Sequence, residues 1–447
     1  MSKYRVTTDL FTLPYKDGQF VLYAPLVGFM SAVNEELLDL LAGLETLDEA
    51  PLDEAQQHAL DYLAAKGVVN GATSASITPD PTRFAPSKLT LFPTSECNLR
   101  CRYCYVADAA ETRVMDWAVA TSAIRYFIKV LKREGKTVFP LEFHGGGEPL
   151  FAWNLVKRIV AFAEEQCAQE GFDLNVFSAT NGVLNERQRA WIVEHFTSLN
   201  VSFDVLPHVQ DYHRATASRH GTFDVVDRTL KHFDAHDFPY GIRCTVSTYN
   251  EHLLEETIDF VTQHYNTHLL FIEPVSDSGC GAMQAGTLQP DMARFVENYK
   301  RLEPICAKRG VRLEYSGAQM EKLSPTFCYV GTDNFAVTPD GHLTNCWEVT
   351  SADHPLADPF LFGRILPGGD VAIDQARLDY LRTFTVDRFD YCKDCFARWH
   401  CAGDCPTKLG HQDYHGPRGG IRCETNRQLI AHRIIQMLER EHYYQHA

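Results

Sequence analysis

Six strand-like runs between residues 89 and 275 limit the folds open to this chain more than any other part of the sequence. Each run is rich in Val, Leu, Ile or Phe, and amphipathic helical patterns lie between them. Strand-and-helix units at roughly 30-residue spacing favour a parallel sheet with helices outside it. We therefore predict an α/β fold built on a partial (β/α)6 barrel of TIM type. The expected strands are 89–94, 141–146, 174–182, 201–206, 240–248 and 269–275, with helices that include 115–134, 152–170, 186–197 and 222–235.

Three cysteines follow the first strand directly, in the segment TSECNLRCRYCYV. Cys97, Cys101 and Cys104 have the spacing C-x3-C-x2-C. Barrels of this kind bind ligands at the carboxyl ends of their strands, where this segment is expected to lie. Four thiolates complete an iron–sulfur cubane, so three leave one iron open to a chelating substrate or cofactor. The alternatives are a zinc site with a distant fourth ligand and a set of redox-active thiols.

A second group of cysteines lies in the C-terminal part. From residue 311 onward the alternating strand and helix patterns give way to a hairpin and a cysteine-rich segment dominated by loops. The segment FAVTPDGHLTNCWEV predicts a hairpin that turns at Pro-Asp-Gly, and a closing helix is expected over 424–440. Seven thiolates are nearly enough for two four-ligand iron–sulfur clusters, and the alternative is two structural zinc sites. The cysteines, with a glycine between the first two, are Cys328, Gly341, Cys346, Cys392, Cys395, Cys401, Cys405 and Cys423.

The first cysteine segment resembles the radical S-adenosylmethionine (radical SAM) superfamily. The C-x3-C-x2-C loop of that family follows the first barrel strand, often with an aromatic residue before the last cysteine, as Tyr103 is here. The resemblance implies that Cys97, Cys101 and Cys104 hold a catalytic [4Fe–4S] cluster. It also implies that S-adenosylmethionine chelates the open iron through its amino and carboxylate groups. Reductive cleavage would then give a 5′-deoxyadenosyl radical that abstracts a substrate hydrogen.

Two later segments resemble further motifs of the same family. FHGGGEPL, after the second strand, places the GGE motif on Gly146, Gly147 and Glu148, which implies contact with the methionine amine. VSFDV resembles the S-x-D-G segment, which implies that Ser202 and Asp204 lie near the ribose or methionine part. In this sequence Val205 stands where the family usually has Gly, so the contacts made by the backbone there are in question.

DYHRATASRHGTF resembles the related D-x-x-R pattern and makes Arg214 a candidate to bind the carboxylate of S-adenosylmethionine. Arg243 on the fifth strand is the alternative for that contact. Glu273 and Pro274, at the end of the sixth strand, are expected to close the nucleoside pocket. For Ser202, Asp204 and the other residues in these weaker matches, an ordinary loop position is the competing interpretation.

The C-terminal cysteine order resembles the SPASM domain, the auxiliary-cluster extension of radical SAM enzymes that mature peptides and proteins. The resemblance implies a nearer cluster on three thiols and a distal cluster on four. Some relatives have an eighth cysteine before the first of these, and the segment SGAQMEKLSPTFC has none. The nearer cluster is therefore expected to have an open iron, a non-cysteine ligand, or a distant ligand such as Cys280 or Cys306. The nearer set is Cys328, Cys346 and Cys405, and the distal set is Cys392, Cys395, Cys401 and Cys423; Cys167 and Cys244 are expected to be core residues.

Residues 1–85 form a separate module in the sequence, with strand-like pieces followed by VNEELLDLLAGL and DEAQQHALDYLAAKGVV. The order predicts a small winged-helix-like unit, and it resembles the PqqD-like recognition element that precedes many peptide-maturing radical SAM enzymes. Such a unit can bind a leader peptide on an exposed strand edge. The alternative is an appendage that only stabilises the barrel. The expected domains are 1–85 for peptide recognition, 86–310 for the radical SAM core and 311–447 for the SPASM domain.

Composition limits the partners and the cellular compartment that are expected for the chain. Its 447 residues carry a net charge of −16, which argues against a general nucleic-acid or anionic-membrane binder. No run of about 18 apolar residues is present, and the N-terminus lacks the apolar stretch of a signal peptide. We therefore expect a cytoplasmic protein with no membrane partner. Disulfides are disfavoured there, so metal is the leading explanation for 14 cysteines.

Together the resemblances imply an enzyme, a radical SAM/SPASM maturase that modifies a ribosomally made precursor peptide carrying a leader. The expected product is an oxidative modification such as an intramolecular C–C, thioether or ether cross-link. The expected cofactors are S-adenosylmethionine and three iron–sulfur clusters, and the expected reductant is a flavodoxin or ferredoxin. The rival interpretations are a sulfatase-maturing enzyme that makes formylglycine, a non-catalytic iron–sulfur carrier or scaffold, and a zinc-stabilised peptide adaptor.

Overall fold

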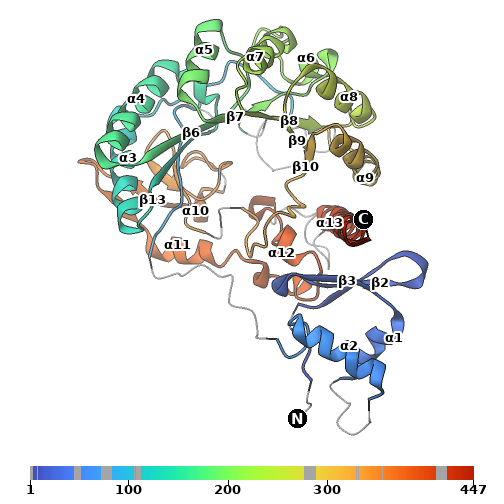
Figure 1. The fold of residues 1–447 in the computed structure, drawn as a ribbon. Coiled ribbons are helices and arrows are strands. Elements are labelled where there is room, and N and C mark those ends of the chain that lie inside the picture. Colours follow the sequence, from blue (N-terminus) through green and yellow to red (C-terminus); the bar gives the residue numbers. More distant parts are fainter. Residues whose placement is uncertain are drawn as a thin grey trace.

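A computed structural model describes most of the chain. It covers residues 4–7, 9–44, 52–71, 83–104, 106, 112–275, 288–328, 330, 332–354, 356–408 and 420–446, with the backbone alone for 408 and 441–446. Cys280, a candidate distant ligand, lies outside the described residues. Figure 1 shows an arc of strands and outer helices, a C-terminal region inside and below the arc, and a small N-terminal module at the lower edge.

The arc is a parallel sheet covered by helices on its outer side (Figure 1). Its strands pair in the order β10-β9-β8-β7-β6-β5-β4, and the α/β partial barrel expected from the sequence is confirmed. The strands are β4 Leu89–Leu91, β5 Val138–Phe143, β6 Asp173–Thr180, β7 Ser198–Ser202, β8 Tyr240–Val246, β9 Leu269–Pro274 and β10 Arg312–Glu314. The helices are α3 Trp117–Arg133, α4 Trp153–Glu170, α5 Glu186–His195, α6 Pro207–His213, α7 Phe223–Ala235, α8 Leu254–His264 and α9 Met292–Lys308.

The sheet does not end where the sequence indicated. β10 pairs in parallel with β9 and lies beyond residue 310, the expected end of the barrel. At the other edge, β11 pairs in parallel with β4, and three antiparallel strands continue the same sheet. The expected hairpin is formed by β11 and β12. These strands and the intervening helices are β11 Phe335–Val337, β12 His342–Thr344, β13 Leu361–Ile365, β14 Val371–Ile373, α10 Ala357–Phe360 and α11 Gln375–Arg382.

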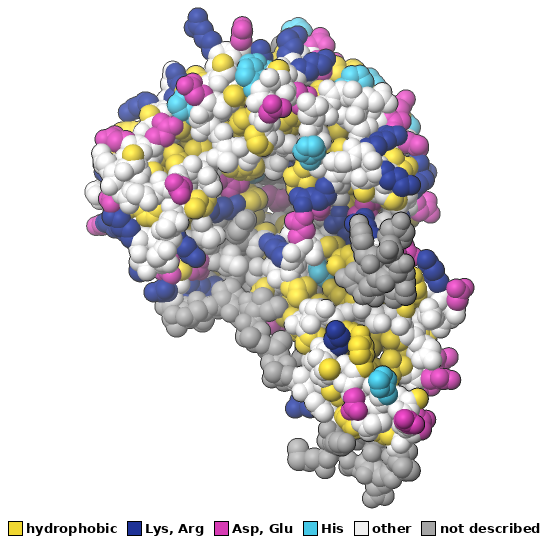
Figure 2. Space-filling view, in the orientation of Figure 1, with side chains coloured by type: hydrophobic (Ala, Val, Ile, Leu, Met, Phe, Trp, Pro, Cys, Tyr) yellow, Lys and Arg dark blue, Asp and Glu magenta, His cyan; other side chains and the backbone are white. Residues whose placement is uncertain are grey.

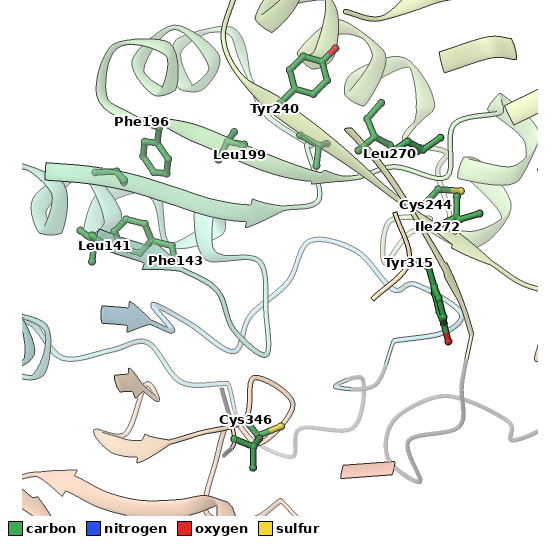
Figure 3. Close-up of a cluster of buried hydrophobic side chains, with 14 of the residues drawn as sticks. Leu141, Phe143, Phe196, Leu199, Tyr240, Cys244, Leu270, Ile272, Tyr315 and Cys346 are labelled. Atoms are coloured by element: carbon green, nitrogen blue, oxygen red, sulfur yellow. The ribbon is translucent and has the colours of Figure 1, made fainter. Parts of the chain in front are cut away.

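The spacing of apolar residues explains why the outer helices form and how they pack. In α3 the buried positions include Ala120, Ile124, Phe127 and Leu131, which repeat every three or four residues on one face. Phe127 packs edge-on against Phe139 of β5, with ring centroids 5.0 Å apart. Figure 3 shows other strand side chains in this core, such as Phe143 on β5. One continuous core therefore joins the sheet, its helices and part of the C-terminal region.

The N-terminal module has the expected order of strands and then two helices: β1 Phe11–Pro14, β2 Phe20–Ala24, β3 Phe29–Val33, α1 Glu35–Gly43 and α2 Glu54–Ala65. Its three strands form an antiparallel sheet. Leu22, Leu41 and Leu60 belong to a small core of its own, whereas Leu13 and Tyr23 pack into the main core. The module is therefore docked on the rest of the chain through β1 and β2.

The docking surface belongs to the cysteine-rich region. The Tyr23 hydroxyl lies 2.5 Å from Nε2 of His400, which is on α12 Arg398–Cys401. Arg398 also forms a 3.0 Å ion pair with Asp9. The closing helix α13, Gly420–His446, packs on β3 as well (Figure 1). The N-terminal module thus contacts the segment that carries Cys401.

The outer surface carries acidic and basic side chains interspersed over the helices (Figure 2). No helix in the described part of the chain is both long enough and apolar enough to cross a membrane. Cys167 and Cys244 are buried in the core, as the sequence led us to expect. Cys306 is also buried, inside α9.

Candidate active site

A cavity of about 1290 Å³ lies between the barrel and the C-terminal region. Cys101, Tyr103 and Cys104 line it from the loop after β4. On the other side, the lining includes Cys328, Cys346 and Cys405. Figure 3 labels Cys346 on a loop of the C-terminal region, at the edge of the core to which the strand side chains also belong. Two cysteine groups that are more than 200 residues apart in the sequence therefore open onto one space.

The cysteine loop is fixed on one side by the glycine segment after β5. The amide of Glu148 donates a 2.8 Å hydrogen bond to the carbonyl oxygen of Glu96, the residue before Cys97. A Cβ at Gly147 would overlap that carbonyl oxygen and lie 2.6 Å from the carbonyl carbon of Ser95. Gly147 is therefore needed for close approach of two backbones.

On the other side the loop is held by the segment after α6. The amide of Arg100 donates to the carbonyl of Ala215 at 2.8 Å, and the amide of Arg102 donates to the carbonyl of His213 at 2.9 Å. Leu99 and Thr216 form an isolated antiparallel bridge between the same two segments. Because the loop is tied to the chain on both sides, its thiols have a preset position.

Glu148 connects the ends of β5 and β6. Its carboxylate accepts hydrogen bonds from the amide of Asn181 (2.6 Å), the hydroxyl of Thr180 (2.8 Å) and the amide of Leu150 (3.1 Å). Burial raises the pKa of Glu148 to about 7, although these donors oppose the shift. The side-chain amide of Asn181 in turn donates to Asn98 at 2.7 Å and lies 3.9 Å from the sulfur of Cys97.

Asp204 organises the opposite wall of the site. It is fully buried, and its Oδ2 accepts hydrogen bonds from the hydroxyl of Tyr103 (2.5 Å), Nδ1 of His213 (3.1 Å) and Nε of Arg214 (3.2 Å). Burial works to raise the pKa of Asp204, but the charge of Arg214 and the bonds from His213 and Tyr103 hold it at about 2. The guanidinium of Arg214 also lies over the ring of Tyr103, 5.1 Å from its centroid. Asp204 thus holds Tyr103 and Arg214 at the cavity.

Val205 departs from the expected glycine but has a backbone that glycine favours. Its φ is 69°, in the left-handed region that β-branched residues rarely occupy. Its side chain is completely buried, so packing retains a conformation that costs on the order of 1–3 kcal/mol at such a residue. The replacement therefore leaves the turn after β7 intact.

The far end of the cavity carries Glu273 at the end of β9. Its two carboxylate oxygens accept hydrogen bonds from the amide (2.8 Å) and hydroxyl (2.9 Å) of Ser316. Arg243 on β8 lies 3.7 Å from the same carboxylate and is half exposed. Arg243 is therefore a cation in reach of a ligand, beside the more deeply buried Arg214.

The residues expected to bind the cofactor divide into two sets. Tyr103, Ser202, Arg214 and Glu273 line the cavity, as do Arg243 and Pro274. The remaining four lie behind the wall or beside the loop and are not among the lining residues: Gly146, Gly147, Glu148 and Asp204. Their observed contacts position the cysteine loop, Tyr103 and Arg214.

The sequence motifs did not identify some residues of the site. Asn181 and His213 connect the cysteine loop to the strand ends through hydrogen bonds to Glu148, Asn98 and Asp204. Asn181 directly follows β6, so its place at the carboxyl end of a strand was a usable signal. His213 precedes Arg214 in the D-x-x-R segment, but no spacing rule marks it.

The C-terminal cysteines form two neighbouring groups. Burial raises the pKa of Cys346 well above its ordinary value, and the nearby Glu348, Cys405 and Cys328 raise it further. Burial likewise raises the pKa of Cys392 to about 12, with Cys395 and Cys423 adding to the effect. Cys401 has Cys423 and Cys392 among its neighbours, and its pKa is also raised. The structure therefore brings together the same two sets that the sequence order implied.

The donor chemistry fits iron–sulfur clusters at these positions. Within the described residues no cysteine forms a disulfide, and no three His, Cys, Asp or Glu side chains converge on a single ion position. The thiolates of a cubane each bind a different iron, so they need not converge on one point. The sulfurs also receive polar contacts of the kind that tune clusters: Asn426 Nδ2 lies 3.1 Å from Cys401 Sγ, and the amide of Leu99 lies 3.4 Å from Cys97 Sγ.

Comparison with known families decides the class of the domain. Residues 91–261 match the model of the Radical SAM superfamily. The chain contains a radical SAM domain. The matched range begins in β4 and ends in α8, so it includes the cysteine loop and the ends of strands β4 to β8, but not Glu273 at the end of β9. The expectation of a radical SAM enzyme is confirmed.

Curated relatives are similar over most of the chain. A serine-type anaerobic sulfatase-maturating enzyme of Klebsiella aerogenes is 24% identical over 346 residues, which cover 74% of this chain and 83% of the relative. An uncharacterized protein of Archaeoglobus fulgidus is 25% identical over 75% of this chain and 78% of its own length. The sporulation killing factor maturation protein SkfB of Bacillus subtilis is 23% identical over 59% of this chain and 60% of its own.

Solved structures share the fold at low identity. The structure of native anSMEcpe with bound AdoMet superposes with a TM-score of 0.64 at 17% identity, covering 79% of this chain and 99% of the other. SuiB of Streptococcus suis, bound to the precursor peptide SuiA, superposes with a TM-score of 0.52 at 13% identity, covering 91% of this chain and 96% of the other. Both likenesses show the fold of the chain.

Proposed function

We propose that this chain is a radical SAM maturase that oxidises a ribosomally made precursor peptide and installs an intramolecular cross-link. The observation that carries the proposal is the shared cavity, onto which Cys101 and Cys104 open from one side and Cys328, Cys346 and Cys405 from the other. A substrate segment in this space would lie between the two groups of thiols. The similarity to sulfatase-maturating enzymes, SkfB and SuiB supports a peptide or protein substrate.

In this proposal Cys97, Cys101 and Cys104 hold the catalytic [4Fe–4S] cluster, which with S-adenosylmethionine supplies the power to abstract hydrogen from an unactivated carbon. Cys328, Cys346 and Cys405 hold the nearer auxiliary cluster, and Cys392, Cys395, Cys401 and Cys423 hold the distal one. The total of three clusters is part of the proposal. A flavodoxin or ferredoxin is the proposed reductant.

The chain's own residues have separate tasks around the cavity. Arg214, fixed by Asp204, and the half-exposed Arg243 are cations placed to bind a carboxylate. Tyr103 is held by the same Asp204 and presents its ring at the cavity wall. Gly147 and Glu148 hold the cysteine loop in place. Partial burial of the loop thiols restricts the access of solvent to the site.

Residues 1–85 serve as the recognition module for the leader of the peptide in this proposal. β1 and β3 lie at the two edges of the three-stranded sheet, and an extended peptide can add to such an edge through main-chain hydrogen bonds. The module contacts α12, which carries Cys401, so a bound leader would lie close to the cysteine-rich region. The remainder of the peptide would then reach the cavity.

A second function has specific support. The relatives include both serine-type and cysteine-type sulfatase-maturating enzymes, and anSMEcpe gives a higher TM-score than SuiB. On that alternative the chain oxidises a Ser or Cys side chain to formylglycine, an aldehyde. SuiB, however, covers 91% of this chain and anSMEcpe 79%, which favours the maturation of a precursor peptide.

The test is anaerobic reconstitution followed by incubation with S-adenosylmethionine, dithionite and a precursor peptide encoded beside the gene. Peptide-stimulated release of 5′-deoxyadenosine and loss of two hydrogens from the peptide are expected. An aldehyde-reactive hydrazide separates the two candidates, because formylglycine binds it and a cross-linked peptide does not. Iron without any 5′-deoxyadenosine would contradict the proposal and favour an electron carrier. Stoichiometric zinc in place of iron would favour an adaptor.

A further inference from the structure

Glu348 has a position among the nearer thiols that no motif assigned. It lies two residues after Cys346 and lines the cavity. Thr407 connects it to a second thiol, because the Thr407 hydroxyl donates to Oε2 of Glu348 at 3.0 Å and lies 3.1 Å from the sulfur of Cys405. The carboxylate of Glu348 is therefore next to two of the three nearer cysteines.

The other acidic side chains of the cavity wall differ from Glu348 because arginines neutralise them. Within the described residues Glu348 forms no ion pair, and its carboxylate accepts a hydrogen bond from the neutral hydroxyl of Thr407. Its ionisable neighbour His354 has a pKa lowered by burial, which favours the neutral ring although the charge of Glu348 opposes the shift. A carboxylate that faces a cavity beside two of these thiols, without an ion-pair partner, is available to a metal. The paired acids and their arginines are Glu134 with Arg83, Glu273 with Arg243, Glu314 with Arg433, Glu321 with Arg312, and Asp333 with Arg382.

Among the residues that the structure describes, which do not include Cys280, the nearer group has three thiols and no fourth. Cys328, Cys346 and Cys405 are the cysteines that the described residues bring together at this end of the cavity. Cys306, considered from the sequence as a distant ligand, is buried inside α9 and is not among the cavity residues. A [4Fe–4S] cluster on three thiolates has one iron that needs another ligand.

We propose that the carboxylate of Glu348 is the fourth protein ligand of the nearer auxiliary cluster. This inference rests on the proposed function, because it requires that cluster to be present. A carboxylate oxygen completes the coordination of the fourth iron while three thiolates bind the others. The closed site excludes direct binding of a substrate side chain to this cluster.

The experiment uses the full chain with Cys97→Ala, Cys101→Ala and Cys104→Ala, which removes the open iron of the catalytic cluster. The protein is reconstituted anaerobically, reduced with dithionite and mixed with isotopically labelled cyanide. Coupling of the labelled carbon to the reduced cluster, read by pulsed EPR, reports an iron without a protein ligand. We expect no coupling with Glu348 present and clear coupling after Glu348→Ala or Glu348→Gln.

Two further variants make the result specific. Glu348→Cys supplies a thiolate and is expected to close the site again, so that cyanide coupling is absent. Glu321→Gln removes another acid of the same cavity wall, one that is paired with Arg312, and is expected to leave the spectrum unchanged. Glu348→Gln keeps a polar side chain of nearly the same size, so a folding defect of the Ala variant would not decide the outcome.

Cyanide coupling in the protein that retains Glu348 would overturn the inference, because the fourth iron would then be open. Absence of coupling after both Glu348→Ala and Glu348→Gln would also overturn it, because another ligand would be closing the site. Iron and sulfide counts separate this failure from failure of the proposed function. If auxiliary iron is present but the cyanide coupling differs from the expected pattern, only the assignment of Glu348 as a ligand is refuted. If the chain holds no auxiliary iron, the ligand assignment and the proposed function are both refuted.

Discussion

Replacing Gly147 with Ala is expected to separate the cysteine loop from the segment after β5. The added Cβ would overlap the carbonyl oxygen of Glu96 and lie 2.6 Å from the carbonyl carbon of Ser95. Both neighbours are backbone atoms, which cannot rotate out of the way as a side chain can. The two segments must therefore move apart, and the hydrogen bond from the Glu148 amide to Glu96, now 2.8 Å long, is lost or lengthened.

The free-energy cost of Gly147→Ala is the sum of overpacking and the loss of this hydrogen bond. Overpacking of this kind costs roughly 1–3 kcal/mol, and the lost hydrogen bond adds roughly 0.5–1.5 kcal/mol. We expect a local loss of about 2–4 kcal/mol in the free energy that holds the cysteine loop against the barrel. Since 1.4 kcal/mol corresponds to a factor of ten, amide hydrogen exchange in this loop should accelerate at least roughly 30-fold.

Gly146→Ala is the matched control. There the three nearest atoms to the Cβ all belong to side chains: Oγ1 of Thr350 at 2.8 Å, Cγ1 of Val106 at 3.0 Å and Cβ of Thr350 at 3.2 Å. Rotation of these side chains can relieve part of the overlap, which a backbone carbonyl cannot do. Its backbone φ is not in the left-handed region, so alanine is permitted and the net change is expected to stay within about 1 kcal/mol. The residue next to Gly147 thus receives the same methyl group with a different outcome.

The assay is hydrogen exchange of residues 93–104 in the cluster-free protein under reducing, anaerobic conditions, which separates packing from iron ligation. Release of 5′-deoxyadenosine by the reconstituted variants follows as a second readout. Faster exchange is expected for Gly147→Ala and not for Gly146→Ala, and release of 5′-deoxyadenosine is expected to fall in Gly147→Ala. Equal exchange in the two variants would refute the argument that Gly147 is required by the approach of two backbones.

Further predictions concern the buried polar contacts. The pKa of Glu148 is raised from 4.5 to about 7 by burial, so the folded state binds the proton more tightly and loses stability as the pH rises through that window, by about 3 kcal/mol in total. Glu148→Gln should flatten the dependence of the unfolding midpoint between pH 4.5 and 7, and an unchanged slope would contradict the assignment. Tyr23→Phe leaves Nε2 of His400 without its 2.5 Å partner and should cost about 1–3 kcal/mol. Limited proteolysis should then release the N-terminal module more readily, whereas Tyr62→Phe, at a half-exposed side chain, should have no such effect.

Much of the barrel could be predicted because its strands contain clusters of apolar residues and alternate with amphipathic helices. β5 and β6 are long enough to give this signal, and they begin at Val138 and Asp173. The continuation of the sheet was harder to foresee. β11 and β12 have three residues each, too few for a periodic pattern, and β11 joins the sheet by pairing with a strand more than 240 residues earlier.

In the site, too, local sequence spacing could be interpreted in advance, whereas contacts between distant segments could not. Cysteine spacing indicated which thiols would lie together, because a short C-x3-C-x2-C segment is local. The positions of Asn181, His213 and Glu348 depend on contacts between segments far apart in the chain. For Glu148 and Asp204 the motif indicated the location, but the structure shows that their carboxylates bond to neighbouring protein groups and lie outside the cavity lining.

The central claim is that this chain abstracts hydrogen from a peptide held in the cavity between the two cysteine groups. The most direct measurement uses a precursor peptide with deuterium at its carbon-bound positions, incubated anaerobically with S-adenosylmethionine and dithionite. Mass spectrometry of the released 5′-deoxyadenosine is then the readout. We expect deuterium in the 5′-deoxyadenosine from the intact chain and none when Cys101→Ala removes a thiol of the loop. Release of 5′-deoxyadenosine without deuterium, while the peptide is nevertheless modified, would contradict it.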